Sequence, residues 1–250
     1  MDIAKLREIA RTFQTRLDEQ KAALAGENIP WYPYGTLSNL EWLDRLLQGE
    51  QRELDGLFGK GPIADIGAAD GDIAFLLDAT GHEVDIVDFP PTNYNGCRGA
   101  HALKAALGAR VGILETDLDR RFELPRASYS FAFFMGILYH LKNPYGAMEA
   151  LAKHAKHAIV STRITKYSAR AEVAGRVELA KLPLAYLLGP DECNNDATNF
   201  WIFSEAGLRR LFDRTGWDVV SWVNVGDTVQ SDPASLDHDE RAFCLLRSRH

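Results

Sequence analysis

The chain has 250 residues, 46% of them hydrophobic, which is enough to bury the core of one large α/β domain and excludes a disordered protein. Its formal net charge of −7 disfavours a broadly basic surface for nucleic acid. Three cysteines without a CxxC pair exclude a secreted disulfide scaffold, and we expect a cytoplasmic protein with no membrane-spanning segment.

The N-terminal part, residues 1–58, is predicted to be a helical cap. Apolar residues in the range 3–24 recur three or four positions apart, the spacing of an amphipathic helix. A loop rich in aromatic residues and prolines follows at 30–35. Ser38 and Glu41 then form a capping-box pattern that predicts the start of a second helix.

Beyond Pro62, short β-rich runs alternate with helical runs. This alternation is typical of βαβ units, whose strands pair in parallel and whose helices cover both faces of the sheet. The predicted strands are the runs IADIG, EVDIVD, VGILET, SFAFFMG and AIVSTR, followed later by WDVVSWVNV and RAFCLLRS. We therefore predict a single α/β domain with a mostly parallel sheet and helices on both faces.

Three segments follow the cap within this predicted domain. Residues 62–162 form the core, and residues 163–203 interrupt the alternation as an insertion or lid. Residues 204–250 supply a last helix and a strand pair. Ser204 is predicted to cap that helix and Gly216 to end it.

The segment from Asp65 to Gly71, DIGAADG, follows the first predicted strand and opens a helix. Glycines at such a turn let the backbone approach a ligand closely. A P-loop is excluded because Gly71 is followed by Asp72 instead of lysine. The dinucleotide pattern GxGxxG fails as well, because its second and third glycines would fall on Ala69 and Asp72.

The charge of this loop favours a cationic cofactor. Asp65, Asp70 and Asp72 would repel the pyrophosphate of a dinucleotide. The same carboxylates suit a cofactor that carries a sulfonium and an ammonium group. The loop therefore favours S-adenosylmethionine (SAM) over a dinucleotide, with an ordinary strand-to-helix turn as the alternative.

Acidic residues also follow the next two predicted strands. Asp88 ends the second strand, where a carboxylate can accept hydrogen bonds from both ribose hydroxyls. Phe89 can flank an adenine, and Asp117 can accept from the adenine amino group. The predicted cofactor-binding residues are Asp65, Gly67, Ala68, Ala69, Asp70, Gly71, Asp88, Phe89, Asp117, Leu118 and Met135.

The loop DIGAADG resembles the first motif of class I SAM-dependent methyltransferases, and the similarity runs from about Pro62 onward. The resemblance implies a Rossmann-like sheet of seven strands, one of them antiparallel, and methyl transfer from SAM. Within this class, FMGILYHLKNP at 134–144 and TNFWIFS at 198–204 are similar to segments of the tRNA wobble-uridine carboxymethyltransferases.

The chain departs from that branch at the cofactor's extra carboxylate. The branch binds carboxy-SAM with basic residues, one of them an arginine just before the asparagine that matches Asn199. Thr198 stands at the position of that arginine, and the loop at 31–34 lacks the branch's lysine. A buried carboxylate without cations is costly, so we expect plain SAM as the cofactor.

Tyr139 and His140 follow the fourth predicted strand, at the edge where an open parallel sheet has its crevice. We predict both as catalytic residues, with His140 acting as a base if the acceptor is a hydroxyl. Methyl transfer otherwise needs alignment of the reactants and exclusion of water. The alternative is that His140 satisfies backbone groups at the start of the next helix.

The predicted acceptor-binding residues come from two segments that depart from the βα alternation. The aromatic loop at 31–34 and the polar cluster at 193–201 are predicted to close the acceptor pocket together. The alternatives are a hydrophobic plug for the first segment and ordinary turn chemistry for the second. The predicted residues are Trp31, Tyr34, Asn195, Asn199 and Trp201, and no metal-ligand spacing is found.

Three functions are compatible with these patterns. The first is a SAM-dependent methyltransferase for a small-molecule or glycan-like acceptor, and the second is a tRNA wobble-uridine methyltransferase or carboxymethyltransferase. The third is a non-catalytic subunit with the same fold. The acidic composition favours the first over the tRNA enzyme, whereas the oligomeric state stays open.

Overall fold

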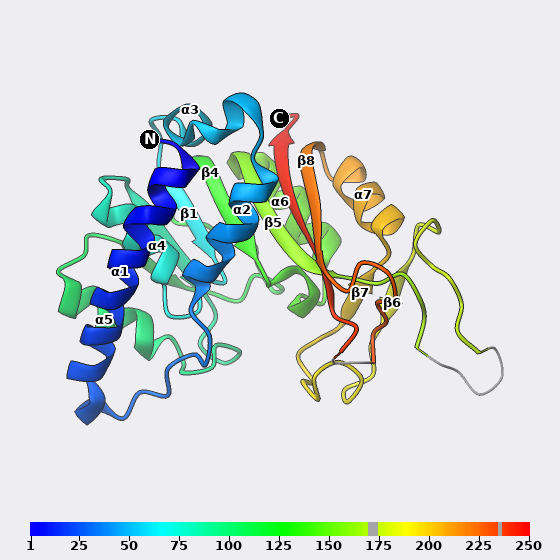
Figure 1. Cartoon of the computed structure of the whole chain (residues 1–250), viewed down its shortest axis with the longest axis horizontal. Coiled ribbons are helices and arrows are strands. Elements are labelled where there is room, and N and C mark those ends of the chain that lie inside the picture. Colours follow the sequence, from blue (N-terminus) through cyan, green and yellow to red (C-terminus); the bar gives the residue numbers. More distant parts are fainter. Residues whose placement is uncertain (170–174, 235–236) are drawn as a thin grey trace. The chain divides into compact units, whose positions relative to one another are not determined.

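The structure, a computed structural model of the chain, describes residues 1–169, 175–234 and 237–250 (Figure 1). Residues 170–174 of the predicted insertion lie outside the described residues.

The described residues divide into two compact units. Unit 1 comprises Met1–Phe133 and His154–His157, and unit 2 comprises Phe134–Lys153 and Ala158–His250. The segment boundaries predicted from the sequence stay a prediction.

Unit 1 begins with helices and continues with alternating strands and helices, as the sequence predicted. Its elements in chain order are α1 (Ile3–Ala23), η1 (Ala25–Glu27), η2 (Thr36–Asn39), α2 (Leu40–Leu46), η3 (Gly49–Arg52), α3 (Leu54–Phe58), β1 (Ile63–Ile66), α4 (Asp72–Ala79), β2 (Val84–Asp88), α5 (Arg98–Leu107), β3 (Gly112–Glu115) and β4 (Tyr129–Met135), the last of which ends in unit 2.

The strands of unit 1 follow the order β3-β2-β1-β4. β2 pairs in parallel with both β1 and β3, and the register places Asp65 beside Ile86 and Asp88 beside Glu115. The carboxyl ends of β1, β2 and β3 therefore lie at one edge of the sheet. This is the edge at which open parallel sheets bind ligands.

Helix α1, the first helix of the chain, packs against α2, α4 and α5 of unit 1 (Figure 1). Its buried face carries Leu6, Phe13 and Leu17, the apolar stripe that predicted it. The predicted capping box is wrong: Ser38 lies in η2, and its hydroxyl donates to the Gly35 carbonyl at 2.8 Å. The 3₁₀ helix η2 runs directly into α2, so backbone hydrogen bonds at this point already replace the bonds that a capping side chain would make.

Unit 2 contains the remaining elements, except that the end of α6 and the start of β5, His154–His157, belong to unit 1. The remaining elements are η4 (Leu138–His140), α6 (Pro144–His154), β5 (Ala155–Ile164), β6 (Ala185–Leu187), β7 (Trp201–Phe203), α7 (Glu205–Arg214), β8 (Trp217–Gly226) and β9 (Glu240–Ser248).

Pairing in unit 2 is mixed. β5 pairs in parallel with β7, whereas β6 pairs antiparallel with β7. The long strands β8 and β9 form an antiparallel pair, and β9 also pairs with β5. The described residues thus form nine strands instead of the seven expected. The two extra strands, β6 and β7, have three residues each, too few to show a strand period.

The predicted ends of the last helix are confirmed. The Ser204 hydroxyl accepts from the Gly207 backbone N–H at 2.9 Å, so Ser204 caps α7. Gly216 follows the helix with φ +90°, a conformation that side chains disfavour. The α/β class with parallel βαβ units is likewise confirmed, and only the strand count is corrected.

Candidate functional site

The loop between β1 and α4 makes the sharp turn that its glycines predicted. Gly67, Ala69 and Gly71 all have positive φ values. A Cβ on Gly71 would lie 2.8 Å from the side chains of Ile86 and Phe75, so only glycine fits there. The turn is closed by a hydrogen bond from the Gly71 N–H to the Ala68 carbonyl at 2.8 Å. The loop is therefore held tightly against β2 and α4.

Asp65 lies in β1 just before this loop and is almost completely buried. Burial raises its pKa to about 7, because desolvation outweighs the hydrogen bond from the Ala74 backbone, and the charges of Asp88 and Asp72 add to the rise. A cation placed beside Asp65 would favour the ionised carboxylate.

Asp88 connects β2 to the loop. Its carboxylate accepts from the backbone N–H groups of Phe89 at 2.7 Å and Ala69 at 3.2 Å, and from the Asn93 amide at 3.0 Å. A carboxylate offers about four lone-pair positions, so about one stays available for a ligand. The sequence led us to expect two bonds to a ribose, and the structure reduces this to one in the observed conformation.

Asp70 and Asp72 are also buried, and they bind the N-terminal cap. The ammonium of Lys21, in α1, lies 3.2 Å from an Asp70 oxygen and 3.3 Å from an Asp72 oxygen. Two backbone N–H groups also donate to these carboxylates, from Tyr32 in the aromatic loop to Asp70 and from Thr36 at the start of η2 to Asp72, both at 3.1 Å. The Asn95 amide donates to the other Asp70 oxygen at 2.7 Å. The cationic partner that the sequence led us to seek in the cofactor is thus supplied by the chain itself. The predicted contact of Asp70 with the cofactor stays a prediction.

The aromatic loop is fixed by aromatic contacts as well as by these carboxylates. The Tyr32 hydroxyl accepts from the Tyr94 backbone N–H at 3.0 Å, and the two rings lie 5.5 Å apart. The Lys21 ammonium lies 5.4 Å from the Trp31 ring centroid, and Tyr34 is largely exposed. Their predicted role in binding the acceptor is not tested by these contacts.

The residues after β3 form a turn. One Asp117 carboxylate oxygen accepts from the backbone N–H groups of Asp119 and Arg120, at 3.0 and 3.3 Å, and Leu118 is buried behind it. The other Asp117 oxygen keeps capacity for an adenine amino group. Phe89 is half-buried at the end of β2.

In unit 2, His140 is held by the loop that follows β6. Its Nδ1 lies 3.1 Å from the Thr198 carbonyl oxygen and 3.0 Å from the Thr198 hydroxyl. A carbonyl only accepts, so Nδ1 carries the proton and Nε2 has a free lone pair. Burial lowers the pKa of His140, although Thr198 and Asp196 oppose this. The ring is therefore neutral at pH 7, as a general base requires.

Tyr139 is buried beside His140, with their ring centroids 4.3 Å apart. Its hydroxyl accepts from Arg241 Nη1 at 3.4 Å, and its carbonyl accepts from the Phe200 N–H at 2.8 Å. Met135 lies at the end of β4 and is partly exposed.

The predicted acceptor residues of unit 2 differ in their surroundings. Asn195 is exposed with φ +50°, the conformation of a turn. Asn199 is buried, and its amide donates to the Cys193 carbonyl at 2.9 Å while its Oδ1 has no partner among the described residues. The Trp201 indole N–H is also buried without a partner there. Asn199 and Trp201 therefore have binding capacity left, whereas Asn195 has the geometry of a turn.

Comparison with known families decides the class. Residues 38–222, most of the chain, match the family described as a methyltransferase domain. The chain belongs to the methyltransferase-domain family. This membership confirms the predicted class and its cofactor type, SAM, but does not confirm the tRNA wobble-uridine branch.

Solved structures share the fold of this methyltransferase domain. The N-terminal domain of EvdMO1, solved with S-adenosylhomocysteine bound, has a TM-score of 0.57 at 15% identity, covering 96% of this chain and 97% of that chain. The cyclase SpnF has a TM-score of 0.55 at 12% identity, covering 96% of both chains. A SAM-dependent methyltransferase from Methanosarcina mazei has a TM-score of 0.52 at 12% identity, covering 78% and 96%. No curated protein matches the chain.

The chain also contains site residues that could not be recognised from the sequence. In the sequence, Lys21 is one of several charged residues on an amphipathic helix, so nothing there indicates a site residue. Asn93 lies in an ordinary turn sequence. The side-chain oxygen Oδ1 of Asn93 accepts from the backbone N–H groups of Asn95 and Cys97, at 3.1 and 2.9 Å, so this side chain organises the loop around Asp88. Arg163 and Arg241 were missed in unit 2.

Two further findings concern the described part of the chain only. No group of three or more His, Cys, Asp or Glu side chains there is placed to hold a metal ion. None of its helices has the length and apolar character that a membrane crossing requires.

Proposed function

We propose that the protein transfers a methyl group from SAM to a small-molecule or glycan-like acceptor. The observation that carries this proposal is the arrangement of Asp88 and Asp65 at the carboxyl ends of β2 and β1. Asp88 retains an acceptor position for a ribose hydroxyl, and the buried Asp65 carboxyl favours a nearby cation. A hydrogen-bond acceptor for a ribose hydroxyl and a carboxylate beside a cation both fit SAM.

The fold alone does not carry the proposal, since a cyclase shares it. The family match supports methyl transfer, and the S-adenosylhomocysteine in the EvdMO1 domain supports a cofactor of this type. SAM supplies an electrophilic methyl group when bound. The residues of this chain orient the reactants, exclude water and hold protons.

In this proposal Asp88 and Asp117 orient the ribose and the adenine. The half-buried Phe89 covers the adenine, and the tight turn at Gly71 lets the loop backbone approach the cofactor. His140 accepts the proton of a hydroxyl acceptor at Nε2 while Thr198 holds Nδ1–H.

Calorimetric titration with SAM tests the cofactor site. Asp88→Ala removes about one charge-assisted hydrogen bond to the ribose, so SAM affinity is expected to fall about tenfold to a hundredfold. Asp85→Asn is the matched control. Asp85 is a buried carboxylate in the same strand, but it binds Arg126 and the Tyr129 hydroxyl instead. Unchanged SAM affinity in Asp88→Ala, or an equal loss in Asp85→Asn, would contradict the assignment.

A competition between SAM and carboxy-SAM tests the tRNA alternative. Thr198 replaces the arginine of the related branch, and its hydroxyl is already engaged with Asp196 at 2.7 Å. Carboxy-SAM is therefore expected to bind no more tightly than SAM. Tighter binding of carboxy-SAM would contradict this expectation and favour the tRNA carboxymethyltransferase function.

A further inference from the structure

The strongest unexplained feature of unit 2 is a buried arginine at the end of β5. The Arg163 side chain is 1% exposed, and its Nη1 donates to the Cys193 sulfur. Its Nε lies 2.6 Å from Asp239 Oδ1 but is poorly aligned for a hydrogen bond, and its Nη2 has no partner among the described residues. A buried guanidinium is costly unless its donors are paired. Arg163 thus has one carboxylate oxygen beside Nε, whereas its Nη2 lacks an acceptor oxygen among the described residues.

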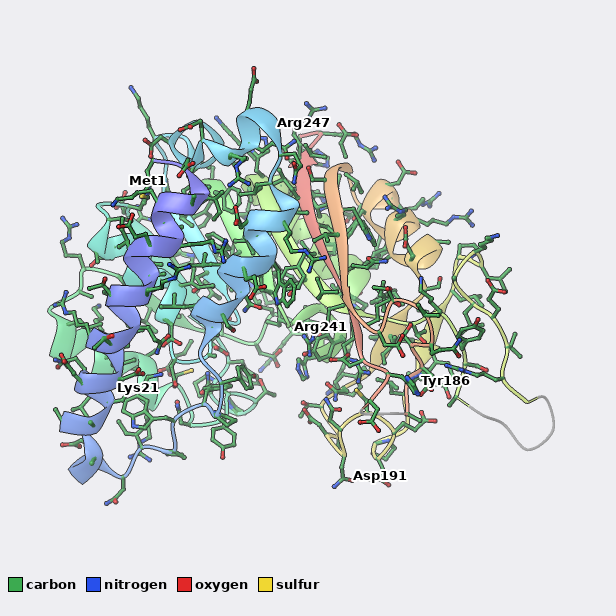
Figure 2. The ribbon with its side chains drawn as sticks, viewed as in Figure 1. Met1, Lys21, Tyr186, Asp191, Arg241 and Arg247 are labelled. Carbon is green, nitrogen blue, oxygen red and sulfur yellow. The ribbon has the colours of Figure 1, made fainter. Side chains whose placement is uncertain are left out.

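Asp239 does not supply that oxygen because it is shared. Its second oxygen lies 3.5 Å from Nε of Arg241, in β9 (Figure 2). A carboxylate binds a guanidinium most strongly through two parallel bonds, and Asp239 cannot make both while it holds Arg241. The neighbouring thiol of Cys193 does not replace it, since burial raises the pKa of Cys193 and keeps the thiol neutral.

Two more polar groups without a partner among the described residues lie on the loop that carries Cys193 and at the start of β7. Asn199 is 3% exposed, and it contacts the same residue, Cys193, as Arg163 does. Its free Oδ1 is an acceptor, and the free indole N–H of Trp201 is a donor two residues further along. A ligand with an anionic group and a hydroxyl would match these groups better than a single water.

The arginines adjoin the candidate base within unit 2. Arg241 donates to the Tyr139 hydroxyl, and its guanidinium lies 5.6 Å from the Tyr139 ring centroid. His140 is bound to Thr198, the residue next to Asn199. We propose that the methyl acceptor is a small molecule with a carboxylate or phosphate group, which pairs with Arg163 and Arg241 beside His140.

This inference rests on the proposed function and narrows its acceptor class. Arg163 is buried between Cys193 and Asp239, so an acceptor reaches it only by displacing one of these neighbours. A polynucleotide phosphate is too bulky to enter such a covered site. The site therefore favours a small anionic metabolite.

The test compares benzoate and phenyl phosphate with neutral benzamide, at constant ionic strength and without cofactor. Melting temperature and calorimetry give the affinity of each probe. We expect the two anions, but not benzamide, to bind and stabilise the wild-type protein. Arg163→Gln should abolish the difference between benzoate and benzamide.

A second variant keeps the test decisive if Arg163→Gln fails to fold. Asp239→Asn removes the internal competitor, so benzoate affinity is expected to rise about tenfold. The matched control is Asp218→Asn, because Asp218 is similarly exposed and is also shared by two arginines, Arg247 at 3.1 Å and Arg249 at 3.5 Å, neither of which is buried as Arg163 is. This control should leave benzoate affinity unchanged.

Three results would overturn the inference. Equal effects of benzoate and benzamide would show that Arg163 is only a structural ion-pair residue, as would equal responses of Asp239→Asn and Asp218→Asn. Arg163-dependent binding of carboxy-SAM without benzoate binding would assign the anion to the cofactor. SAM titration of the same samples separates these outcomes from a failure of the proposed function, which would appear as absent SAM binding.

Discussion

Replacing His140 with glutamine is expected to lower kcat for methyl transfer about 10²- to 10⁴-fold for a hydroxyl acceptor. The change removes the basic Nε2 whose availability follows from the hydrogen bond between Nδ1–H and the Thr198 carbonyl. SAM affinity should stay unchanged, so the loss should appear in kcat. Radiolabelled methyl transfer under SAM saturation measures it.

The pH profile gives the same prediction a second readout. Burial lowers the pKa of His140, so the neutral form that acts as a base persists below the usual range of a histidine. The rate should be flat around pH 7 and fall about tenfold per unit once the pH drops below that lowered pKa. His101→Gln is the control, since His101 is exposed and pairs with Glu115. Full activity of His140→Gln would reduce His140 to a structural role.

Replacing Lys21 with methionine is expected to destabilise the protein by about 3 to 5 kcal/mol. The reason is that Asp70 and Asp72 would remain buried without their shared cation. The control is Lys5→Met on the same helix, whose ion pair with Glu8 is exposed, so its loss should cost less than about 1 kcal/mol. Urea denaturation at pH 7 measures both changes. Equal losses of stability in the two variants would show that the Lys21 bridge stabilises the protein no more than an exposed ion pair does.

The pH dependence of this bridge has a definite sign. Burial alone would lower the pKa of Lys21, but Asp72 and Asp70 outweigh it and raise the pKa above its ordinary value. The stabilisation contributed by Lys21 is therefore complete at neutral pH and is lost on the alkaline side, as the pH rises through the raised pKa of Lys21. On the acidic side the bridge weakens as Asp72 becomes protonated, and burial raises the pKa of Asp72.

Much of unit 1 could be predicted because its signals are local. Apolar runs such as those of β1 and β2 are bounded by glycine or charged residues, and an acid at the end of a parallel strand lies at the ligand edge of the sheet. The turn at Gly71 and the position of Asp88 followed from these signals.

The remaining features depend on contacts between distant residues. Lys21 is 49 positions from Asp70. The sequence therefore indicated that the acidic loop needs a cationic partner, but not that a lysine of α1 is that partner. Arg163 lies in β5 and Asp239 directly precedes β9, so the fold of unit 2 brings them together, and neither belongs to a motif. β6 and β7 were not predicted because a strand of three residues is too short to show the alternation of apolar and polar residues.

Transfer of the labelled methyl group of SAM is the measurement that tests the central claim most directly. The protein is incubated with labelled SAM and, in parallel, with a small-metabolite extract or with total tRNA, using a reaction without protein as the blank. We expect label in the metabolite fraction, strongest in its anionic compounds, and none in tRNA. Label in tRNA alone, or no SAM binding together with no label in either fraction, would contradict it.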